Sequence, residues 1–363
     1  MIVPLSGAPD GLLDRLRVVR ASGDVPLVTD PRWSRTQRDA VVAAAVSADV
    51  TEDIAWATLT SGSSGSPRVV LRSARSWAES FDAVATLLNA GPTDSVALPV
   101  PPVSSLTLFS MAHALAGGPH PILGTDRQTD ATCLHGTPQS LRAVLDSGAL
   151  PHLHTALIGG SRLDPALRRR AEASGIDVRA YYGAAELSFV AVDDGNGLRP
   201  FPGVELSRRA GELWVRSPFV ATGYAGAPGP LRRDGAWATV GDRVEPVNGG
   251  MRLLGRADDA ILSASATIVP DEVEAVLRSI PGVRDAIVFG LPNGLVGSLV
   301  AAFVELEGDA SEAIRATVGV HLAPAHRPRQ WFTGVLPRTG SGKPARAEAV
   351  RCVLAGEVTR LAV

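Results

Sequence analysis

Hydrophobic and polar positions alternate with two different patterns along the first half of the chain. Apolar residues recur at a spacing of three or four over residues 36–48, 74–88, 105–116, 138–147 and 165–174. Short apolar runs separate these segments, at residues 54–59, 95–100, 131–134, 155–158 and 177–181. The spaced pattern predicts helices and the continuous runs predict strands. Strands that alternate with helices predict an α/β fold with a largely parallel sheet.

The pattern changes in the second half of the chain. Between residues 196 and 254, short apolar runs stand among Gly, Pro and Asp, which predicts a small β-rich subdomain with tight turns. After this segment a mixed pattern begins, with helices expected at 270–279, 312–322 and from 345, and strands at 284–289 and 299–305. We therefore expect a large N-terminal α/β domain over residues 1–257 and a small α+β domain over residues 258–363.

Composition and charge limit the classes of protein to which the chain can belong. A chain of 363 residues is long enough for two hydrophobic cores. A net charge of −2 gives no reason to expect nucleic acid or an anionic membrane as a partner. The uncharged run 286–304 contains Pro292 and Gly297, which predict strand, turn and strand in place of a membrane-spanning helix. Because the N-terminus has no signal-peptide pattern, we expect a cytoplasmic protein.

One turn, directly after the apolar residues 54–57, concentrates hydroxyl groups, glycines and a cation. Glycines let backbone N–H groups approach an anion, hydroxyls donate further hydrogen bonds, and an arginine adds a full charge. The turn could therefore bind a phosphate, although the spacing of a Walker A loop is absent. Its candidate ligands are Thr60, Ser61, Gly62, Ser63, Ser64, Gly65 and Arg68. Such a turn is more often merely flexible, so this interpretation depends on other segments.

Three further segments complete a nucleotide-binding set. They are Tyr181-Tyr182-Gly183-Ala184-Ala185-Glu186, then Gly241-Asp242 with Gly255-Arg256-Ala257-Asp258, then Pro337-Arg338-Thr339-Gly340-Ser341-Gly342-Lys343. In their order and approximate spacing, the four segments resemble those of the adenylate-forming superfamily. That superfamily comprises acyl- and aryl-CoA synthetases, the adenylation domains of peptide synthetases and firefly-type luciferases. The resemblance runs from about Ala55 to about Arg346.

This resemblance implies a reaction in two steps. A small-molecule carboxylic acid attacks the α-phosphorus of ATP with release of pyrophosphate, and the acyl group then passes to a thiol. The implied cofactors are ATP, Mg²⁺ and coenzyme A, and a phosphopantetheine carrier protein is an alternative acceptor. The small C-terminal domain is expected to be mobile and to turn between the two steps. The oligomeric state stays open.

The resemblance also implies roles for individual residues. Lys343 would reach the α-phosphate and the carboxylate as a point charge, and Glu186 would bind Mg²⁺. Asp242 and Arg256 would hold the ribose hydroxyls, and Asp258 falls at the hinge position. Further candidates for binding ATP or AMP are Gly159 and Gly160, which would lie against the adenine, and Tyr182, Gly183 and Ala185.

Three departures from the family pattern affect the expected chemistry. Ala185 replaces a Thr or Ser whose hydroxyl contacts the AMP phosphate, and the loss of one hydrogen bond costs about 0.5–1.5 kcal/mol. Ser265 replaces a glycine in the loop that lines the thiol tunnel, which bears on thioester formation more than on adenylation. The region before the phosphate loop is short, and actinobacterial o-succinylbenzoate–CoA ligases have about this length and layout.

The acyl pocket is expected to be apolar. Its candidate residues are Pro101, Val103, Gly183 and Phe189, which favour a fatty or aromatic acid over a charged one. The o-succinylbenzoate ligases carry a Pro-x-His-His stretch where this chain has the histidine-free residues 99–102. We predict an AMP-forming acyl-CoA synthetase. The alternatives are an o-succinylbenzoate–CoA ligase, an enzyme that loads a carrier protein, and a non-catalytic AMP-binding relative.

Overall fold

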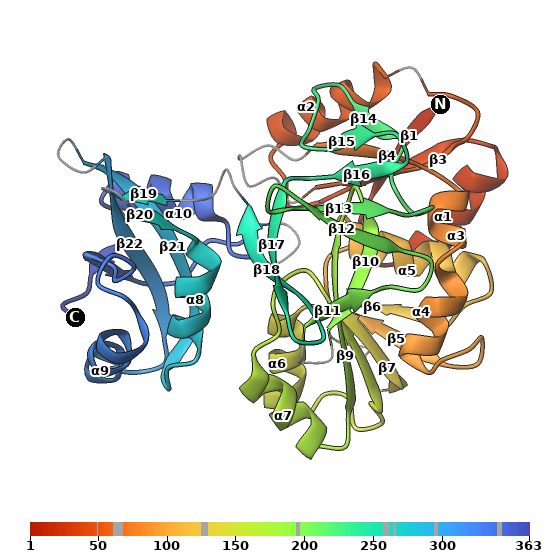
Figure 1. Cartoon of the computed structure of the whole chain (residues 1–363). Coiled ribbons are helices and arrows are strands. Elements are labelled where there is room, and N and C mark those ends of the chain that lie inside the picture. The colour runs from red at the N-terminus through yellow and green to blue at the C-terminus, as the bar shows by residue number, and fades with distance from the viewer. Residues whose placement is uncertain are drawn as a thin grey trace.

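The fold has a large N-terminal part and a smaller C-terminal part, which lie side by side in Figure 1. The structure is a computed structural model that describes residues 1–48, 50–60, 68–124, 130–193, 197–256, 261–263, 266–293, 297–339 and 343–363. In the figure the large part runs from red to green and the small part is blue.

The first sheet of the large part contains the N-terminus. Its strands lie in the order β1 (Ile2–Ser6), β2 (Val25–Thr29), β3 (Ile54–Leu59), β4 (Val69–Ser73) and β14 (Gly223–Ala225). The first three strands are parallel, and β4 is antiparallel to both of its neighbours. Helix α1 (Leu12–Ala21) joins β1 to β2, and α2 (Arg35–Val46) joins β2 to β3. The phosphate-loop candidates therefore stand between two neighbouring antiparallel strands, β3 and β4.

The second sheet begins with a parallel half. Its strands are β6 (His120–Leu123), β5 (Ser95–Leu98), β7 (Cys133–Gly136), β8 (Thr155–Ile158) and β9 (Asp177–Ala184), in that spatial order. Helices α4 (Phe81–Leu88) and α5 (Ser105–Leu115) pack on one face, and α6 (Pro138–Ser147) and α7 (Pro165–Ala173) pack on the other. Along β8, for example, Leu157 joins the first core whereas Ala156 and Ile158 join the second. The predicted parallel α/β architecture is confirmed here.

The second half of this sheet is antiparallel. It continues from β9 through β10 (Ser188–Asp193), β11 (Leu198–Pro200), β18 (Gly250–Arg256), β17 (Asp242–Val247), β13 (Glu212–Arg216), β16 (Trp237–Thr239) and β15 (Arg232–Asp234). Strand β12 (Glu205–Arg209) pairs with β13. These short strands agree with the β-rich subdomain that the Gly- and Pro-rich composition of this region predicted.

The small part is built on a third sheet. Its strands are β19 (Ile261–Ser263), β20 (Ala266–Ile268), β21 (Val283–Asn293), β22 (Gly297–Leu306), β23 (Gln330–Thr333) and β24 (Thr359–Arg360). Helices α8 (Pro270–Arg278) and α9 (Ser311–His321) cover one face, and α10 (Arg346–Leu354) covers the other. Strands β21 and β22 pair in antiparallel register, as the strand–turn–strand interpretation of the uncharged run predicted. No helix among the described residues is long and apolar enough to cross a membrane.

One expectation about the elements needs correction, and one segment was missed. The helix predicted over 74–88 is interrupted, because α3 (Arg75–Ala78) ends before α4 begins at Phe81. At the break, the buried Ser80 hydroxyl donates a hydrogen bond to the Trp77 carbonyl oxygen at 2.7 Å, and such local bonds compete with helix continuation. The segment β1–α1–β2 was not predicted at all.

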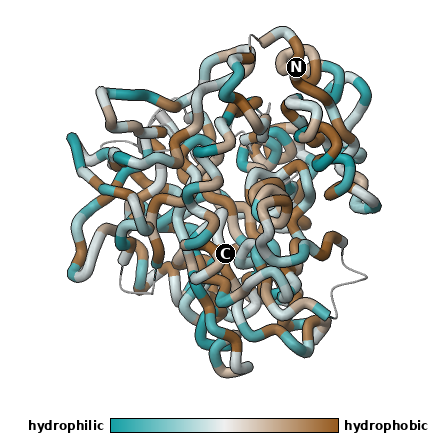
Figure 2. Tube along the Cα trace, turned by 90° about the vertical axis from the view of Figure 1, so that its right-hand side faces the viewer, coloured by the Kyte–Doolittle hydropathy of each residue, from teal (hydrophilic) through white to brown (hydrophobic). Residues whose placement is uncertain are grey.

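The two parts have separate hydrophobic cores. Each cluster of buried apolar side chains found among the described residues belongs wholly to the part before residue 257 or to the part after residue 260. Apolar and polar stretches alternate along the trace throughout Figure 2, as two cores require. The predicted boundary at 257/258 stays a prediction, because residues 257–260 lie outside the described residues.

Candidate active site

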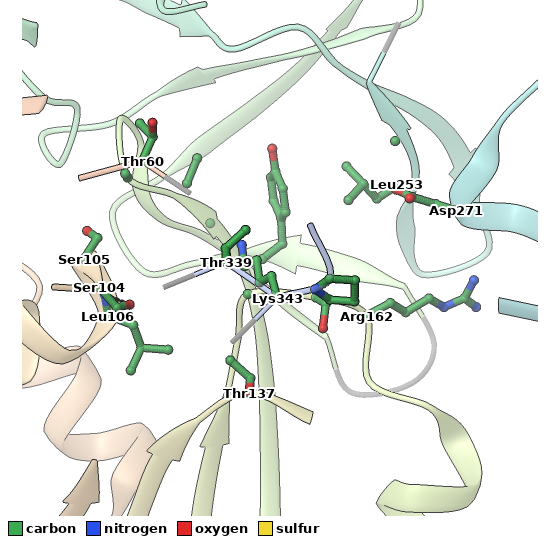
Figure 3. Close-up of a pocket in the computed structure, with 18 of the residues that line it drawn as sticks. Thr60, Ser104, Ser105, Leu106, Thr137, Arg162, Leu253, Asp271, Thr339 and Lys343 are labelled. Atoms are coloured by element: carbon green, nitrogen blue, oxygen red, sulfur yellow. Dashed lines mark hydrogen bonds between the residues drawn. The ribbon is translucent and has the colours of Figure 1, made fainter. Parts of the chain in front are cut away.

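A continuous cavity of about 1750 Å³ lies between the two parts of the molecule. Most of the described candidates line it, and the list is Thr60, Arg68, Val103, Gly160, Tyr182, Gly183, Ala185, Glu186, Phe189, Asp242 and Lys343. In Figure 3 Lys343 stands near the centre, with Thr60 and Ser104 on one side and Leu253 and Asp271 on the other. Segments that are far apart in the sequence therefore meet at one site.

The two ends of the phosphate loop lie close together. The backbone N–H of Thr60 donates to the carbonyl oxygen of Arg68 at 3.0 Å, and the N–H of Arg68 donates to the Thr60 hydroxyl at 3.1 Å. These bonds close the loop at its base and bring both candidate ligands to the cavity wall. The candidates Ser61, Gly62, Ser63, Ser64 and Gly65 lie outside the described residues.

Strand β9 supplies aromatic groups to two sides of the sheet. Successive side chains of a strand point in opposite directions, so Tyr181 and Tyr182 diverge. The Tyr182 hydroxyl donates a short hydrogen bond to Oδ2 of Asp242, the buried first residue of β17. Arg256 stands opposite Asp242 in the register of β17 and β18. The structure therefore brings Tyr182, Asp242 and the backbone of Arg256 together, and ribose binding by Asp242 and Arg256 stays a prediction.

Glu186 is a buried carboxylate with a fixed orientation. Glu186 is only 3% exposed to solvent. The Tyr224 hydroxyl donates a hydrogen bond to Oε1 of Glu186 at 2.8 Å and accepts one from the backbone N–H of Leu231 at 3.1 Å. Burial, and then the Glu186 charge, raises the pKa of Tyr224, so this phenol stays protonated. The sequence interpretation missed Tyr224, which gave no charge or motif signal.

Arg72 supports the segment that carries Glu186. Its fully buried guanidinium donates to the carbonyl oxygen of Ala185 at 2.5 Å and, through a shorter bond, to that of Phe219. Burial lowers the pKa of Arg72 to about 9, against the opposing attraction of Glu186. The sequence interpretation also missed Arg72, which lies in the apolar strand β4.

Gly160 of the large part lies next to the Lys343 side chain of the small part. A Cβ atom at Gly160 would lie 3.1 Å from Cε of Lys343 and 3.4 Å from Cγ2 of Thr137. The φ of Gly160 is +86°, which disfavours any other residue as well. The lysine side chain therefore passes over Gly160, and a larger residue there would displace it.

Gly159 has a different neighbour. A Cβ atom at Gly159 would lie 2.2 Å from Cζ of Tyr181, so the missing side chain makes room for this tyrosine ring. The ring belongs to a buried hydrogen-bonded chain, in which Nδ1 of His135 is 2.7 Å from the Ser110 hydroxyl and Nε2 is 2.9 Å from the Tyr181 hydroxyl. Burial lowers the pKa of His135 to about 3, so the imidazole is neutral. Contact between Gly159 and adenine stays a prediction.

Three of the four acyl-pocket candidates line the cavity. Phe189 is almost fully buried, with its ring centroid 4.9 Å from that of Phe109 and 4.5 Å from that of Tyr181. Val103 and Gly183 also line the cavity, whereas Pro101 lies in the turn before α5 and is not among the lining residues. Phe109, Tyr181 and His135 also line the cavity, and of these three the sequence interpretation missed His135.

Ion pairs hold both ends of the segment that carries Lys343. Arg338 pairs with Asp285 at 3.0 Å and with Glu305 at 3.1 Å on the sheet of the small part. Arg346 pairs with Glu274 of α8 at 2.6 Å. Burial opposes ionisation of Glu274, but Arg346 and then Arg278 outweigh it and lower its pKa. The lysine segment is therefore firmly tied to the small part. Asp258 and Ser265 lie outside the described residues.

Comparison with known proteins gives the family. Residues 11–225 match the family described as AMP-binding enzyme, and residues 272–343 match its AMP-binding enzyme C-terminal domain. The chain therefore belongs to the AMP-binding enzyme family, and it is an enzyme of the AMP-forming acyl- and aryl-CoA ligase class. Enzymes of this class use ATP and coenzyme A, so the predicted family and these two cofactors are confirmed at that level.

Individual relatives agree over most of the chain. A probable 2-succinylbenzoate–CoA ligase of Mycobacterium tuberculosis is 32% identical, over 96% of this chain and 97% of the relative. The medium/long-chain-fatty-acid–[acyl-carrier-protein] ligase FadD10 of the same species is 29% identical, over 89% of this chain and 71% of the relative. A substituted Escherichia coli MenE with bound OSB-AMS has a TM-score of 0.81 at 23% identity, over 97% of this chain and 87% of MenE. The last comparison confirms the fold class.

Proposed function

We propose that the protein activates an uncharged aromatic or fatty acid with ATP and transfers the acyl group to coenzyme A. In the first step a carboxylate oxygen forms a bond to the α-phosphorus, and the bond from that phosphorus to the bridging oxygen breaks to release pyrophosphate. In the second step the thiol sulfur attacks the acyl carbonyl, AMP leaves, and the thiol proton passes to solvent. The observation that carries the proposal is the position of Lys343 over Gly160, in the same cavity as Glu186 and the Tyr182–Asp242 pair.

Each step uses groups that the cavity offers. The Lys343 ammonium would stabilise negative charge on the α-phosphate as the nucleophile approaches. Thr60 and Arg68 would hold the outgoing phosphates, and the Asp242 carboxylate would accept hydrogen bonds from the ribose hydroxyls. Ala185 offers no hydroxyl here, and its carbonyl oxygen is already occupied by Arg72. Arg72 thus fixes the backbone at Ala185 although the hydroxyl of the usual Thr or Ser is missing.

Glu186 fits a magnesium ion. Mg²⁺ prefers oxygen ligands and is commonly bound by one or two carboxylates together with substrate phosphates. Glu186 lines the cavity, and Tyr224 fixes one of its oxygens. Within the described ranges no group of three or more acidic, His or Cys side chains could hold a metal ion by itself. A cation shared between Glu186 and the ATP phosphates agrees with this arrangement, and it would add positive charge beside the phosphates.

The pocket wall supports an uncharged acid. Helix α5, which borders the acyl end, contains no Asp, Glu, Lys or Arg. The rings of Phe109, Tyr181 and Phe189 surround this end, and the His135 imidazole is neutral. A second carboxylate would lose its hydration there, and none of the described residues named for this wall is a cation that could replace it. This argument favours an aryl or alkyl acid over a dicarboxylate, although 2-succinylbenzoate stays the alternative that the Mycobacterium tuberculosis relative suggests.

Acid-dependent exchange of labelled pyrophosphate into ATP tests the first step. The panel contains fatty acids, benzoates and 2-succinylbenzoate, which compares a simple aryl acid with one that carries an added carboxylate. We expect exchange with uncharged acids and a loss of at least a hundredfold in Lys343→Ala. Exchange with 2-succinylbenzoate alone would replace the substrate assignment, and a wild-type enzyme that binds ATP but is silent with every acid would contradict the proposal.

Product analysis then tests the acceptor. Mass spectrometry after addition of coenzyme A should show an acyl-CoA thioester. The carrier-protein alternative, which the relative FadD10 suggests, predicts instead that acyl groups accumulate on a purified phosphopantetheine carrier protein and not on coenzyme A.

A further inference from the structure

Arg338 joins the small part of the molecule to the large part. Its Nη1 donates to Oδ2 of Asp285 at 3.0 Å and to Oε1 of Gln139 at 3.1 Å, and its Nη2 donates to Oε2 of Glu305 at 3.1 Å. Asp285 and Glu305 lie on β21 and β22 of the small part. Gln139 lies in the first turn of α6 in the large part. Of these three partners, Gln139 alone belongs to the other side of the cavity.

Arg338 is rigidly connected to Lys343. The backbone N–H of Thr339 donates to the carbonyl oxygen of Lys343 at 2.7 Å, and the N–H of Ala345 donates to that of Pro337 at 2.8 Å. Arg338 and Pro344 also form an antiparallel bridge. The base of the lysine segment is therefore a short paired ribbon, so a contact that fixes Arg338 also fixes the lysine.

The helix end that carries Gln139 lies directly beside the lysine. Thr137 caps α6 and its Cγ2 faces the same Gly160 position over which the Lys343 side chain passes. Gln139 follows Thr137 closely in sequence and is itself exposed. The Gln139–Arg338 bond and the Lys343–Gly160 contact therefore depend on one orientation of the small part.

That orientation suits adenylation and obstructs the next step. Lys343 stands between lining residues of the two parts (Figure 3), where it can stabilise charge on the α-phosphate. A thiol that attacks the acyl carbonyl must enter the same cavity, so the lysine segment has to withdraw. The ion pairs of Arg338 with Asp285 and Glu305 move with the small part, whereas the bond to Gln139 must break.

We propose that Gln139 is a positioning residue, which holds Lys343 in place for adenylation through its hydrogen bond to Arg338 and delays withdrawal for thioester formation. This inference rests on the proposed two-step function. A single hydrogen bond from a charged donor to an exposed neutral acceptor has a modest effect, so we expect changes of about two- to tenfold.

Separate assays of the two half-reactions test the proposal, with the acid that the exchange panel identifies. In Gln139→Ala, the rate of pyrophosphate exchange should fall about two- to tenfold, and thioester formation from the preformed acyl-adenylate should be unchanged or faster. Gln139→Glu supplies a charged acceptor for Arg338. It should retain exchange and slow thioester formation.

The matched control is Arg142→Ala, which changes a half-buried residue of the same helix that does not line the cavity, and it should alter neither half-reaction. Equal losses in both half-reactions of Gln139→Ala, or no change in either, would overturn the positioning role. Thermal unfolding of each variant separates these results from misfolding. Absence of exchange in the wild type is a distinct result, because it contradicts the proposed function itself.

A distance measurement gives a readout that is independent of turnover. Dyes on cysteines introduced at the exposed positions Ser174 and Val320, in a Cys352→Ser background, report the separation of the two parts by energy transfer. With ATP present, Gln139→Ala should reduce the population with the wild-type separation and Gln139→Glu should increase it. Identical distributions in the three proteins would contradict the proposal.

Discussion

Arg72 shows how a residue can shape the site without facing a substrate. Its guanidinium is fully buried and satisfies the carbonyl oxygens of Ala185 and Phe219, which come from two different segments. It therefore fixes the backbone next to Glu186. Replacement by an apolar residue would leave both buried carbonyl groups without these donors, and each unsatisfied group has a free-energy cost.

We expect Arg72→Leu to lower the free energy of unfolding by about 2–4 kcal/mol. Urea denaturation at neutral pH measures this difference. Arg75→Ala is the matched control, because Arg75 is 81% exposed and its ion pair with Glu79 contributes little. A loss for Arg72→Leu no larger than that of the control would refute the supporting role.

His135 predicts a pH dependence of stability. Burial lowers its pKa in the folded protein from 6.5 to about 3. Below about pH 6.5 the unfolded chain binds a proton that the folded protein excludes, so stability falls as the pH falls towards 3, by about 1.4 kcal/mol per pH unit. His113, whose pKa burial also lowers, acts in the same direction.

Comparison of the wild type with His135→Gln isolates this contribution. The free energy of unfolding, measured in urea between pH 7 and pH 4.5, should fall less steeply in the variant. Parallel pH profiles for the two proteins would show that the buried imidazole does not control acid stability.

Motifs in the sequence indicated candidate residues that the structure places at one cavity, and they missed residues that act through tertiary contacts. Glu186, Asp242 and Lys343 lie in short segments with recognisable composition, and the described structure places all three at one cavity. Arg72 finds its partners far along the chain, at Ala185 and Phe219. No local pattern marks such a residue, because its role exists only after the strands have assembled.

At the scale of the elements, arginine side chains stack on tryptophan rings at the antiparallel edge of the second sheet. The Arg209 guanidinium lies 4.9 Å from the ring centroid of Trp214 and 4.9 Å from that of Trp237. The Arg232 guanidinium lies 5.8 Å from the ring centroid of Trp214, and that of Arg216 lies 5.7 Å from the ring centroid of Trp237. Alternating cations and rings thus join β12, β13, β15 and β16, which are too short to be stable by backbone pairing alone.

A double-mutant cycle of Arg209→Met and Trp237→Leu should give a coupling free energy of about 0.5–1 kcal/mol. Thermal or urea unfolding of the four proteins measures it. The distant pair Arg179→Met and Trp237→Leu serves as the control and should show additive losses. Additivity for the first pair as well would mean that the stacking contributes nothing.

Two helices that begin with a cap and a proline were predicted well, whereas two strands with an internal proline near the N-terminus were missed. Helices α6 and α7 begin where Thr137 and Asp164 precede a proline, as expected from capping. Strands β1 and β2 contain Pro4 and Pro26, and proline is unusual inside a strand because it lacks the N–H donor. The two strands nevertheless pair in parallel register from Ile2 opposite Val25 to Ser6 opposite Thr29, which a single sequence does not reveal.

For the whole molecule, the separate cores predict that the small part folds alone. A fragment that contains residues 258–363 has its own buried clusters on both faces of its sheet. It should show one cooperative thermal transition by circular dichroism, and the full chain should show two transitions. A fragment without cooperative unfolding would contradict both this prediction and the proposed boundary at 257/258.

The separation of the two cores has a consequence for motion. No cluster of buried apolar side chains in the described parts spans the cavity. A rotation of the small part would therefore exchange polar contacts with water and would hydrate little new apolar surface. Since apolar hydration dominates heat capacity changes, the two orientations should have nearly equal heat capacities, and their ratio should vary smoothly with temperature across the range in which the protein is folded.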